Sequence, residues 1–148
     1  MPESRLHTLI KQQILKQITE SPKIQYAKEE QVFKQPNFEI DFTSIIPDIF
    51  CISNNIKIAI EIQLSNIHPT EIARKIKTYT NSNIYTFYIG HYNPDRFSKD
   101  KISFKEYELM LHDIFLGRLY FWDTKEEIIK PIHITEHYLN IQTKYHPS

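Results

Sequence analysis

Two acidic residues, Asp48 and Glu61, stand in apolar stretches that a hairpin would bring together. Asp48 follows Pro47 at the start of one apolar run, and Glu61 lies inside the next run, residues 56–65. The polar break between them, residues 53–55, is typical of a hairpin turn. A carboxylate among isoleucines is costly to bury unless another group compensates its charge. A divalent cation such as Mg2+ or Mn2+ prefers oxygen ligands, so the pattern predicts a metal site at one end of a sheet.

Gln63 is expected on the same side of its strand as Glu61, because alternate residues of a strand share a face. The opposite face would carry the apolar side chains of this run, Ile58, Ile60, Ile62 and Leu64. A metal ion and a polar partner would then occupy one cleft. Taken alone, each residue has a simpler interpretation: Asp48 as a turn residue after proline, and Glu61 and Gln63 as solvated strand positions.

The string Pro47-Asp48, followed by Glu61-Ile62-Gln63, resembles the signature of the PD-(D/E)XK nuclease superfamily. Most members of that superfamily carry lysine where this sequence has Gln63. With Ser65, Arg74 and Tyr79 added, the string is similar to the competence protein CoiA-like branch, which typically uses glutamine there. The main resemblance covers residues 47–90, with weaker similarity near the N-terminus and at residues 117–122.

The resemblance implies an α/β fold, with a restriction-endonuclease-like mixed central sheet flanked by helices. The expected core order is helix, three strands, helix, strand, in a single domain over residues 1–148. The implied activity is that of a Mg2+- or Mn2+-dependent deoxyribonuclease, in which the metal activates water against a phosphodiester bond. Asp48, Glu61 and the backbone carbonyl of Ile62 would hold the metal. Gln63 would replace the catalytic lysine, and it can hydrogen-bond but carries no charge.

Three residues near the N-terminus, Glu3, His7 and Lys11, are spaced four apart and would share one face of a helix. The resemblance makes Glu3 an additional metal or water contact and brings His7 and Lys11 to the phosphate. Lys11 would then supply part of the charge that Gln63 lacks. The alternative is an ordinary solvated helical face.

A basic helix after the second run, with Arg74, Lys75, Lys77 and Tyr79, is the expected DNA contact. Arg74 would clamp a phosphate bidentately, or would be surface charge paired with Glu71. Lys75 and Lys77 would add salt-dependent attraction to the backbone. Tyr79 is expected to pack in the core with its hydroxyl at the rim. The preference for single or double strands stays open, and a homodimer is an expectation drawn from similar nucleases.

Composition fits one globular domain, with 148 residues, 41% apolar and 24% charged. The 18 basic and 18 acidic residues balance, so net charge argues neither for nor against a nucleic-acid partner. Cys51 is the single cysteine, which excludes an internal disulfide and fits a reducing, cytoplasmic location. No apolar run approaches the roughly twenty residues needed to cross a bilayer, so no membrane partner is expected.

The remaining pattern predicts the elements around the site. A first helix begins at Ser4 and ends at residues 21–22, and helical spacing recurs at 68–79 and 107–117. The expected strands are 24–33, 38–42, the two runs of the hairpin, 84–90, 119–122 and 128–134, with a loop over 91–101. Cys51 and Trp122 are expected in the core.

Two other functions fit parts of the sequence. Residues 133–137 match the H-x-x-E-H pattern of inverted zinc proteases. Pro131, two β-branched residues and the absence of acidic residues over 138–148 argue that this match is a coincidence. The stronger alternative is a non-catalytic nucleic-acid-binding or protein-interaction domain on the same fold, which the uncharged Gln63 keeps open.

Overall fold

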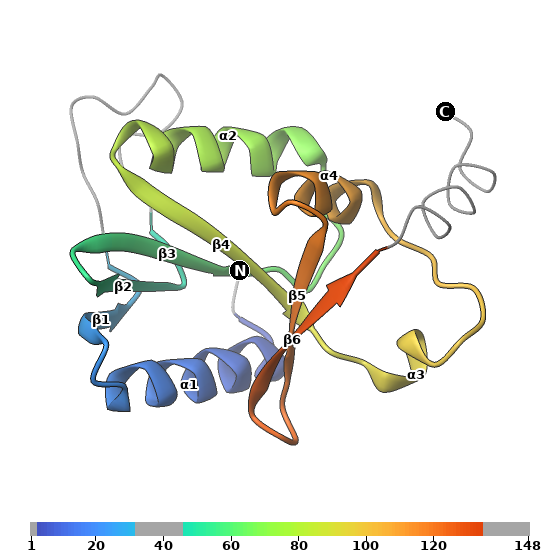
Figure 1. Ribbon diagram of the computed structural model, residues 1–148, viewed down its shortest axis with the longest axis horizontal. Coiled ribbons are helices and arrows are strands. Elements are labelled where there is room, and N and C mark those ends of the chain that lie inside the picture. The colour runs from blue at the N-terminus through green and yellow to red at the C-terminus, as the bar shows by residue number, and fades with distance from the viewer. Residues whose placement is uncertain (1–2, 32–45, 135–148) are drawn as a thin grey trace.

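The computed structural model describes residues 3–31 and 46–134, and within them the fold is a mixed sheet with helices on both faces (Figure 1). The six strands of this part of the chain lie in sequence order across the sheet. The elements are α1 (Arg5–Glu20), β1 (Ile24–Glu29), β2 (Ile49–Ser53), β3 (Ile56–Ile62), α2 (Pro69–Asn81), β4 (Ile84–His91), α3 (Pro94–Phe97), α4 (Glu106–Ile114), β5 (Arg118–Asp123) and β6 (Ile128–His133). The order α1, β1 to β3, α2, β4 confirms the predicted restriction-endonuclease-like core.

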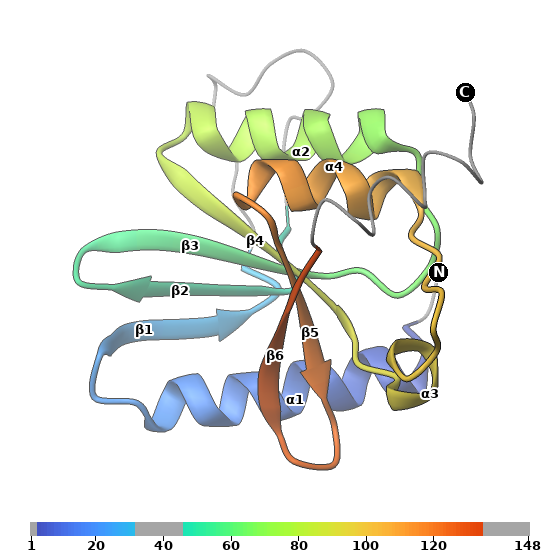
Figure 2. The ribbon, with the colours of Figure 1, turned by 45° about the vertical axis from the view of Figure 1, so that its right-hand side comes forward.

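The sheet combines two antiparallel groups with a parallel centre. β1, β2 and β3 pair antiparallel, β3 and β4 pair parallel across the α2 connection, and β5 and β6 form an antiparallel hairpin. β4 meets β5 only near its end, through Gly90 and His91. Figure 2 shows the consequence: the β5–β6 ribbon crosses the line of β4 steeply, with α1 on one side of the sheet and α2 and α4 on the other.

The turn between β2 and β3 fixes the register that matters for the site. Asn54 and Asn55 have φ angles of 51° and 65°, the left-handed pair that a two-residue hairpin turn requires and that asparagine tolerates. The ladder then sets Ile49 opposite Ile60. The ladder ends at this pair, and Asp48 and Glu61 are the next residues along the two chains.

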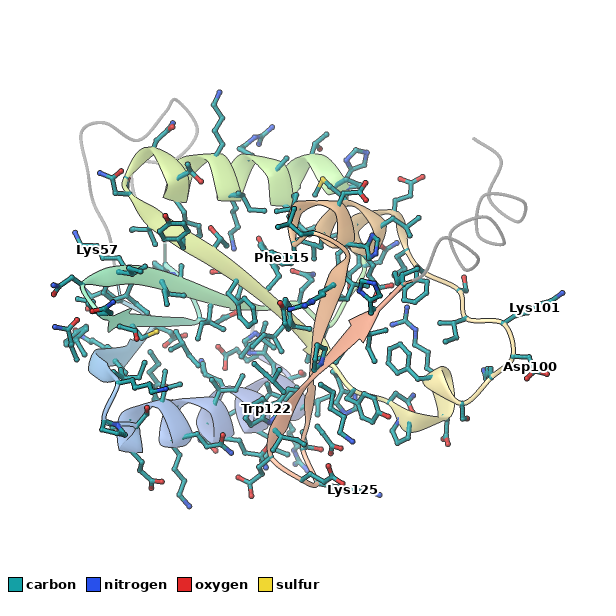
Figure 3. The ribbon with its side chains drawn as sticks, in the orientation of Figure 1. Lys57, Asp100, Lys101, Phe115, Trp122 and Lys125 are labelled. Atoms are coloured by element: carbon teal, nitrogen blue, oxygen red, sulfur yellow. The ribbon has the colours of Figure 1, made fainter. Side chains whose placement is uncertain are left out.

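Alternate residues of β3 point to opposite layers of the core, as the sequence predicts. One layer packs against α1 and contains Ile10, Ile14, Ile49, Cys51, Ile60, Ile62, Ile89 and Trp122. Phe50 and Ala59 face the other layer with Tyr79 of α2. Because Glu61 shares the parity of Ala59, it points to the α2 side. Trp122 of β5 joins the last hairpin to α1, since its Nε1 donates to Oε1 of Gln13 at 2.8 Å. Figure 3 shows Trp122 beside α1.

Several expected boundaries shift in the structure. β1 ends at Glu29, four residues earlier than predicted, and the strand predicted over 38–42 lies outside the described residues. The loop predicted over 91–101 contains the short helix α3, which Asn93 caps by accepting from the N–H of Asp95. Within the described part of the chain, no helix is both long and apolar enough to cross a membrane.

Candidate metal centre

Asp48 closes the open end of the β2–β3 hairpin with its side chain. Its Oδ2 accepts a hydrogen bond of 2.7 Å from the backbone N–H of Ile62. The register places Ile62 opposite Pro47, just outside β2, so the carboxylate supplies the acceptor where the ladder has ended. In an antiparallel ladder the N–H and C=O of one residue point to the same neighbour. The Ile62 carbonyl therefore faces the Asp48 side, the direction expected of a third metal ligand.

Glu61 is buried beneath α2, with 5% of its surface exposed. Its Oε2 accepts from Nζ of Lys75 at 2.8 Å, and its Oε1 accepts from the hydroxyl of Tyr79 at 3.0 Å. Lys75 and Tyr79 are four residues apart, so one face of the helix holds both carboxylate oxygens. The charge of this buried group is thus compensated by the protein itself, a solution that the sequence did not reveal.

The two acids influence each other. Burial raises the pKa of the Glu61 carboxyl above its ordinary value, Lys75 opposes that rise, and the negative charge of Asp48 adds to it. A nearby like charge disfavours the ionised form of a carboxyl group, and a bound cation would relieve that repulsion. Adjacent places at the end of the ladder, and the effect of the Asp48 charge on Glu61, are the features of two acids that would gain from a shared cation.

A second group of ligand atoms gathers on the α1 side of Asp48. One donor atom each from Glu3, His7 and Asp48 lies within 4.8 Å of the others. His7 Nε2 is 3.4 Å from Asp48 Oδ2, and His7 Nδ1 is 3.6 Å from Glu3 Oε2. Ser4 caps α1 by accepting from the N–H of His7 at 3.1 Å, which fixes this first turn. Among the described residues, His7 Nδ1 is buried without a hydrogen-bond partner.

Lys11 lies deeper than its predicted role suggests. Its Nζ is 2.5 Å from Glu3 and 3.5 Å from Glu30, and only 4% of the residue is exposed. Burial opposes the charge of this lysine, but the hydrogen bond and charge of Glu3 raise the pKa of Lys11 above its ordinary value. The Lys11 hydrogen bond in turn lowers the pKa of Glu3. The ammonium is enclosed between carboxylates, and its approach to a phosphate stays a prediction.

Gln63 lies just beyond the end of β3 and folds back on its own chain. Its backbone N–H donates to the carbonyl of Ile89 at 2.9 Å, which continues the parallel pairing with β4. Its side-chain Nε2 donates to the carbonyl of Ser65 at 2.8 Å. This bond uses one of the two N–H donors of the side-chain amide, so the other donor and the Oε1 acceptor can still meet a water or a phosphate.

The predicted DNA-contacting residues divide between surface and core. Arg74 is half-exposed and lies 3.7 Å from Glu71, the surface pair that the sequence offered as its alternative. Lys77 is exposed on the same helix, whereas Lys75 reaches inward to Glu61. Tyr79 is 0% exposed, so its ring packs in the core as expected. Its hydroxyl is not at the rim, where the sequence predicts it, but donates to the buried Glu61.

The Glu61–Lys75 contact joins residues 14 positions apart on different elements, so no spacing rule finds it. The signal that was available is the pair of polar groups four residues apart on α2, Lys75 and Tyr79, which fits a helix covering a polar site. The zinc protease pattern that begins at His133 is not supported. His133 ends strand β6, whereas that pattern requires a helix. Residues 135–137 lie outside the described part of the chain.

Comparison with known families gives a match that spans nearly the whole chain. The family model described as "competence protein CoiA, nuclease-like domain" matches residues 3–146. That range contains all the residues of the candidate centre, from Glu3 to Tyr79. No curated protein and no solved structure matches the chain.

Proposed function

Since the chain belongs to the CoiA nuclease-like domain family, we propose that it is a metal-dependent nuclease that hydrolyses phosphodiester bonds of DNA. Asp48, Glu61 and the carbonyl of Ile62 hold Mg2+ or Mn2+, and Gln63 stands in place of the usual lysine. The observation that carries this proposal is that Asp48 and Glu61 directly follow the last pair of the β2–β3 ladder, Ile49 and Ile60, where Asp48 accepts from the Ile62 amide.

The donor set fits a hard divalent cation. Two carboxylates and a backbone carbonyl are oxygen ligands of the kind that Mg2+ and Mn2+ prefer. Glu3 and His7 extend the set on the α1 side of Asp48. When bound, the ion lowers the pKa of a coordinated water and offsets the charge on the scissile phosphate.

The chain's own residues divide the remaining work. Exposed Arg74 and Lys77 of α2 bind the DNA backbone, a contribution that weakens as salt rises. Gln63 orients the attacking water through the donor or acceptor of its amide that the bond to Ser65 does not use. Tyr79 contributes indirectly, by holding Glu61 in place.

A cleavage assay tests the proposal. Single- and double-stranded DNA are incubated with Mg2+ or Mn2+ and the wild-type protein, beside Asp48→Asn and Glu61→Gln, which remove charge with little change of shape. Metal-dependent cutting by the wild type and its loss in both variants is the expected result. Equal cutting by all three proteins would overturn the proposed roles.

A non-catalytic nucleic-acid-binding domain is the second candidate, because each key side chain already has a structural partner. Asp48 holds Ile62, Glu61 holds Lys75, and Gln63 bonds to Ser65. The same samples separate the two functions. Salt-sensitive DNA binding without cutting in either metal would favour the binding domain.

A further inference from the structure

Lys75 occupies an unusual place between a buried carboxylate and solvent. The side chain of Glu61 is 7% exposed, whereas that of Lys75 is 34% exposed, and their charged atoms are 2.8 Å apart. The ammonium therefore covers the solvent side of a carboxylate that the proposed function assigns to a metal. A phosphate entering from solvent would meet Lys75 before it met Glu61.

Other charged and polar groups around the centre are less suited to meet a substrate. Lys11 is enclosed by Glu3 and Glu30 with 5% of its side chain exposed. Gln63 has no charge and is bonded to the Ser65 carbonyl. Lys75 combines a full charge, a direct contact with a proposed ligand, and access to solvent.

We propose that Lys75 is an exchangeable counter-ion: it neutralises Glu61 while no metal is bound, and metal binding releases its ammonium to the phosphate of the substrate. The inference rests on the proposed function. A buried carboxylate needs a compensating charge, and a metal ion and an ammonium compete for the same Oε2 atom. Once displaced, lysine is a compact charge on a flexible stem, which suits it to follow a phosphate.

The exchange predicts effects of opposite sign in one variant. Lys75→Met keeps an unbranched side chain that is one atom shorter and removes its charge. With its competitor gone, Mn2+ is expected to bind roughly threefold to tenfold more tightly. With the phosphate partner gone, the cleavage rate at saturating Mn2+ is expected to fall on the order of tenfold to a hundredfold. A residue that merely braced the fold would weaken both.

A matched control is available far from the site. Lys125 is exposed in the β5–β6 turn, at the opposite end of the molecule from α2 (Figure 3). Lys125→Met loses the same charge and is expected to leave Mn2+ affinity and cleavage rate unchanged. Lys75→Arg keeps the charge and is expected to restore most of the cleavage rate.

The deciding measurements are Mn2+ binding by calorimetry without DNA, thermal unfolding without metal, and then cleavage. Lys75→Met is expected to unfold at a lower temperature than the wild type when metal is absent, because Glu61 loses its partner. The double variant Lys75→Met/Glu61→Gln, which lacks both charges of this pair, is expected to recover that loss and so separates the pairing from a general folding defect.

The outcomes distinguish the two claims. Tighter Mn2+ binding with slower cutting in Lys75→Met supports the exchange. The exchange alone is overturned if the wild type binds Mn2+ and cuts DNA but Lys75→Met behaves like Lys125→Met. The same holds if Lys75→Met binds Mn2+ more weakly than the wild type. A wild type that neither binds Mn2+ nor cuts DNA overturns the proposed nuclease and the exchange with it.

Discussion

The candidate centre has two halves that meet at the hairpin end but sit in different environments. On the α2 side, Glu61 is buried and both its oxygens are bonded by Lys75 and Tyr79. On the α1 side, Asp48 is 21% exposed at its side chain and shares its surroundings with His7 and Glu3. The β2–β3 hairpin brings both acids to one end, and the helices that cover them leave Glu61 desolvated and hydrogen-bonded and Asp48 more accessible.

This difference assigns unequal importance to the two halves. A ligand held by two hydrogen bonds in a dry site needs little rearrangement when charge develops nearby. A partly solvated cluster can gain and lose ligands at lower cost. We therefore expect the α2 half to determine whether chemistry occurs, and the α1 half to modulate it.

Loss of a ligand in each half gives the largest expected contrast. Glu61→Gln should lower the cleavage rate by about a thousandfold, since a lost metal ligand removes several kcal/mol of stabilisation. Glu3→Gln should lower it by about tenfold, because Glu3 is accessory. Steady-state cleavage assays at saturating Mg2+ measure both. Equal losses in the two variants would remove the proposed hierarchy.

Replacement of Asp48 by alanine should destabilise the fold more than replacement by asparagine. Asp48→Ala leaves the N–H of Ile62 without its acceptor and should lower the free energy of unfolding by about 1–3 kcal/mol. Asp48→Asn keeps an oxygen at that place and should lose less than half as much. Denaturant unfolding of both variants makes the comparison. If Asn and Ala destabilise equally, the bond to Ile62 is not what holds this residue.

Removal of the Tyr79 hydroxyl should be a smaller change confined to the α2 half. Tyr79→Phe deletes one hydrogen bond to Glu61 and should lower the free energy of unfolding by about 1.5 kcal/mol, the lower end for a bond to a charged group. Tyr85→Phe is the matched control, because Tyr85 is 69% exposed on β4 and should show no change. A Tyr79→Phe protein as stable as the control would contradict the role given to this hydroxyl.

The two halves should respond to pH in opposite directions, with the smallest effects of the series. The pKa of Glu61 is raised by burial, so its contribution to stability is present below the ordinary value of 4.5 and is lost as pH rises above it. The pKa of Glu3 is lowered by the hydrogen bond from Lys11, so its contribution is present above 4.5 and is lost as pH falls.

Thermal unfolding across pH 3 to 7 checks these signs, since roughly this range spans both transitions. In Glu61→Gln, the unfolding temperature should fall less than in the wild type as pH rises. In Glu3→Gln, it should fall less than in the wild type as pH is lowered. The expectation fails if the two variants change the pH profile in the same direction.

Local patterns predicted most of the described fold because they carry their own signals. Asn54-Asn55 marks the turn, the alternation of β3 marks its two faces, and Ser4 marks the start of α1. Helix α3 was missed because four residues give no periodicity, and its cap at Asn93 resembles any loop asparagine.

The candidate site was predicted less completely, since residue types are visible in a sequence and contacts between distant elements are not. The pattern identified Asp48 and Glu61 as a pair, and the family match over residues 3–146 confirms the CoiA-like resemblance. The sequence pattern did not indicate that Lys75 turns inward, or that the amide of Gln63 bonds to Ser65. Those contacts depend on how α2 crosses the sheet and how the chain bends after β3.

A crystal soaked in Mn2+ and measured by anomalous scattering tests the central claim most directly. The account predicts an anomalous peak between the carboxylates of Asp48 and Glu61, with Nζ of Lys75 moved away from Glu61. A structure without a peak there, or with a peak at Glu3 and His7 alone while Lys75 still holds Glu61, would contradict it.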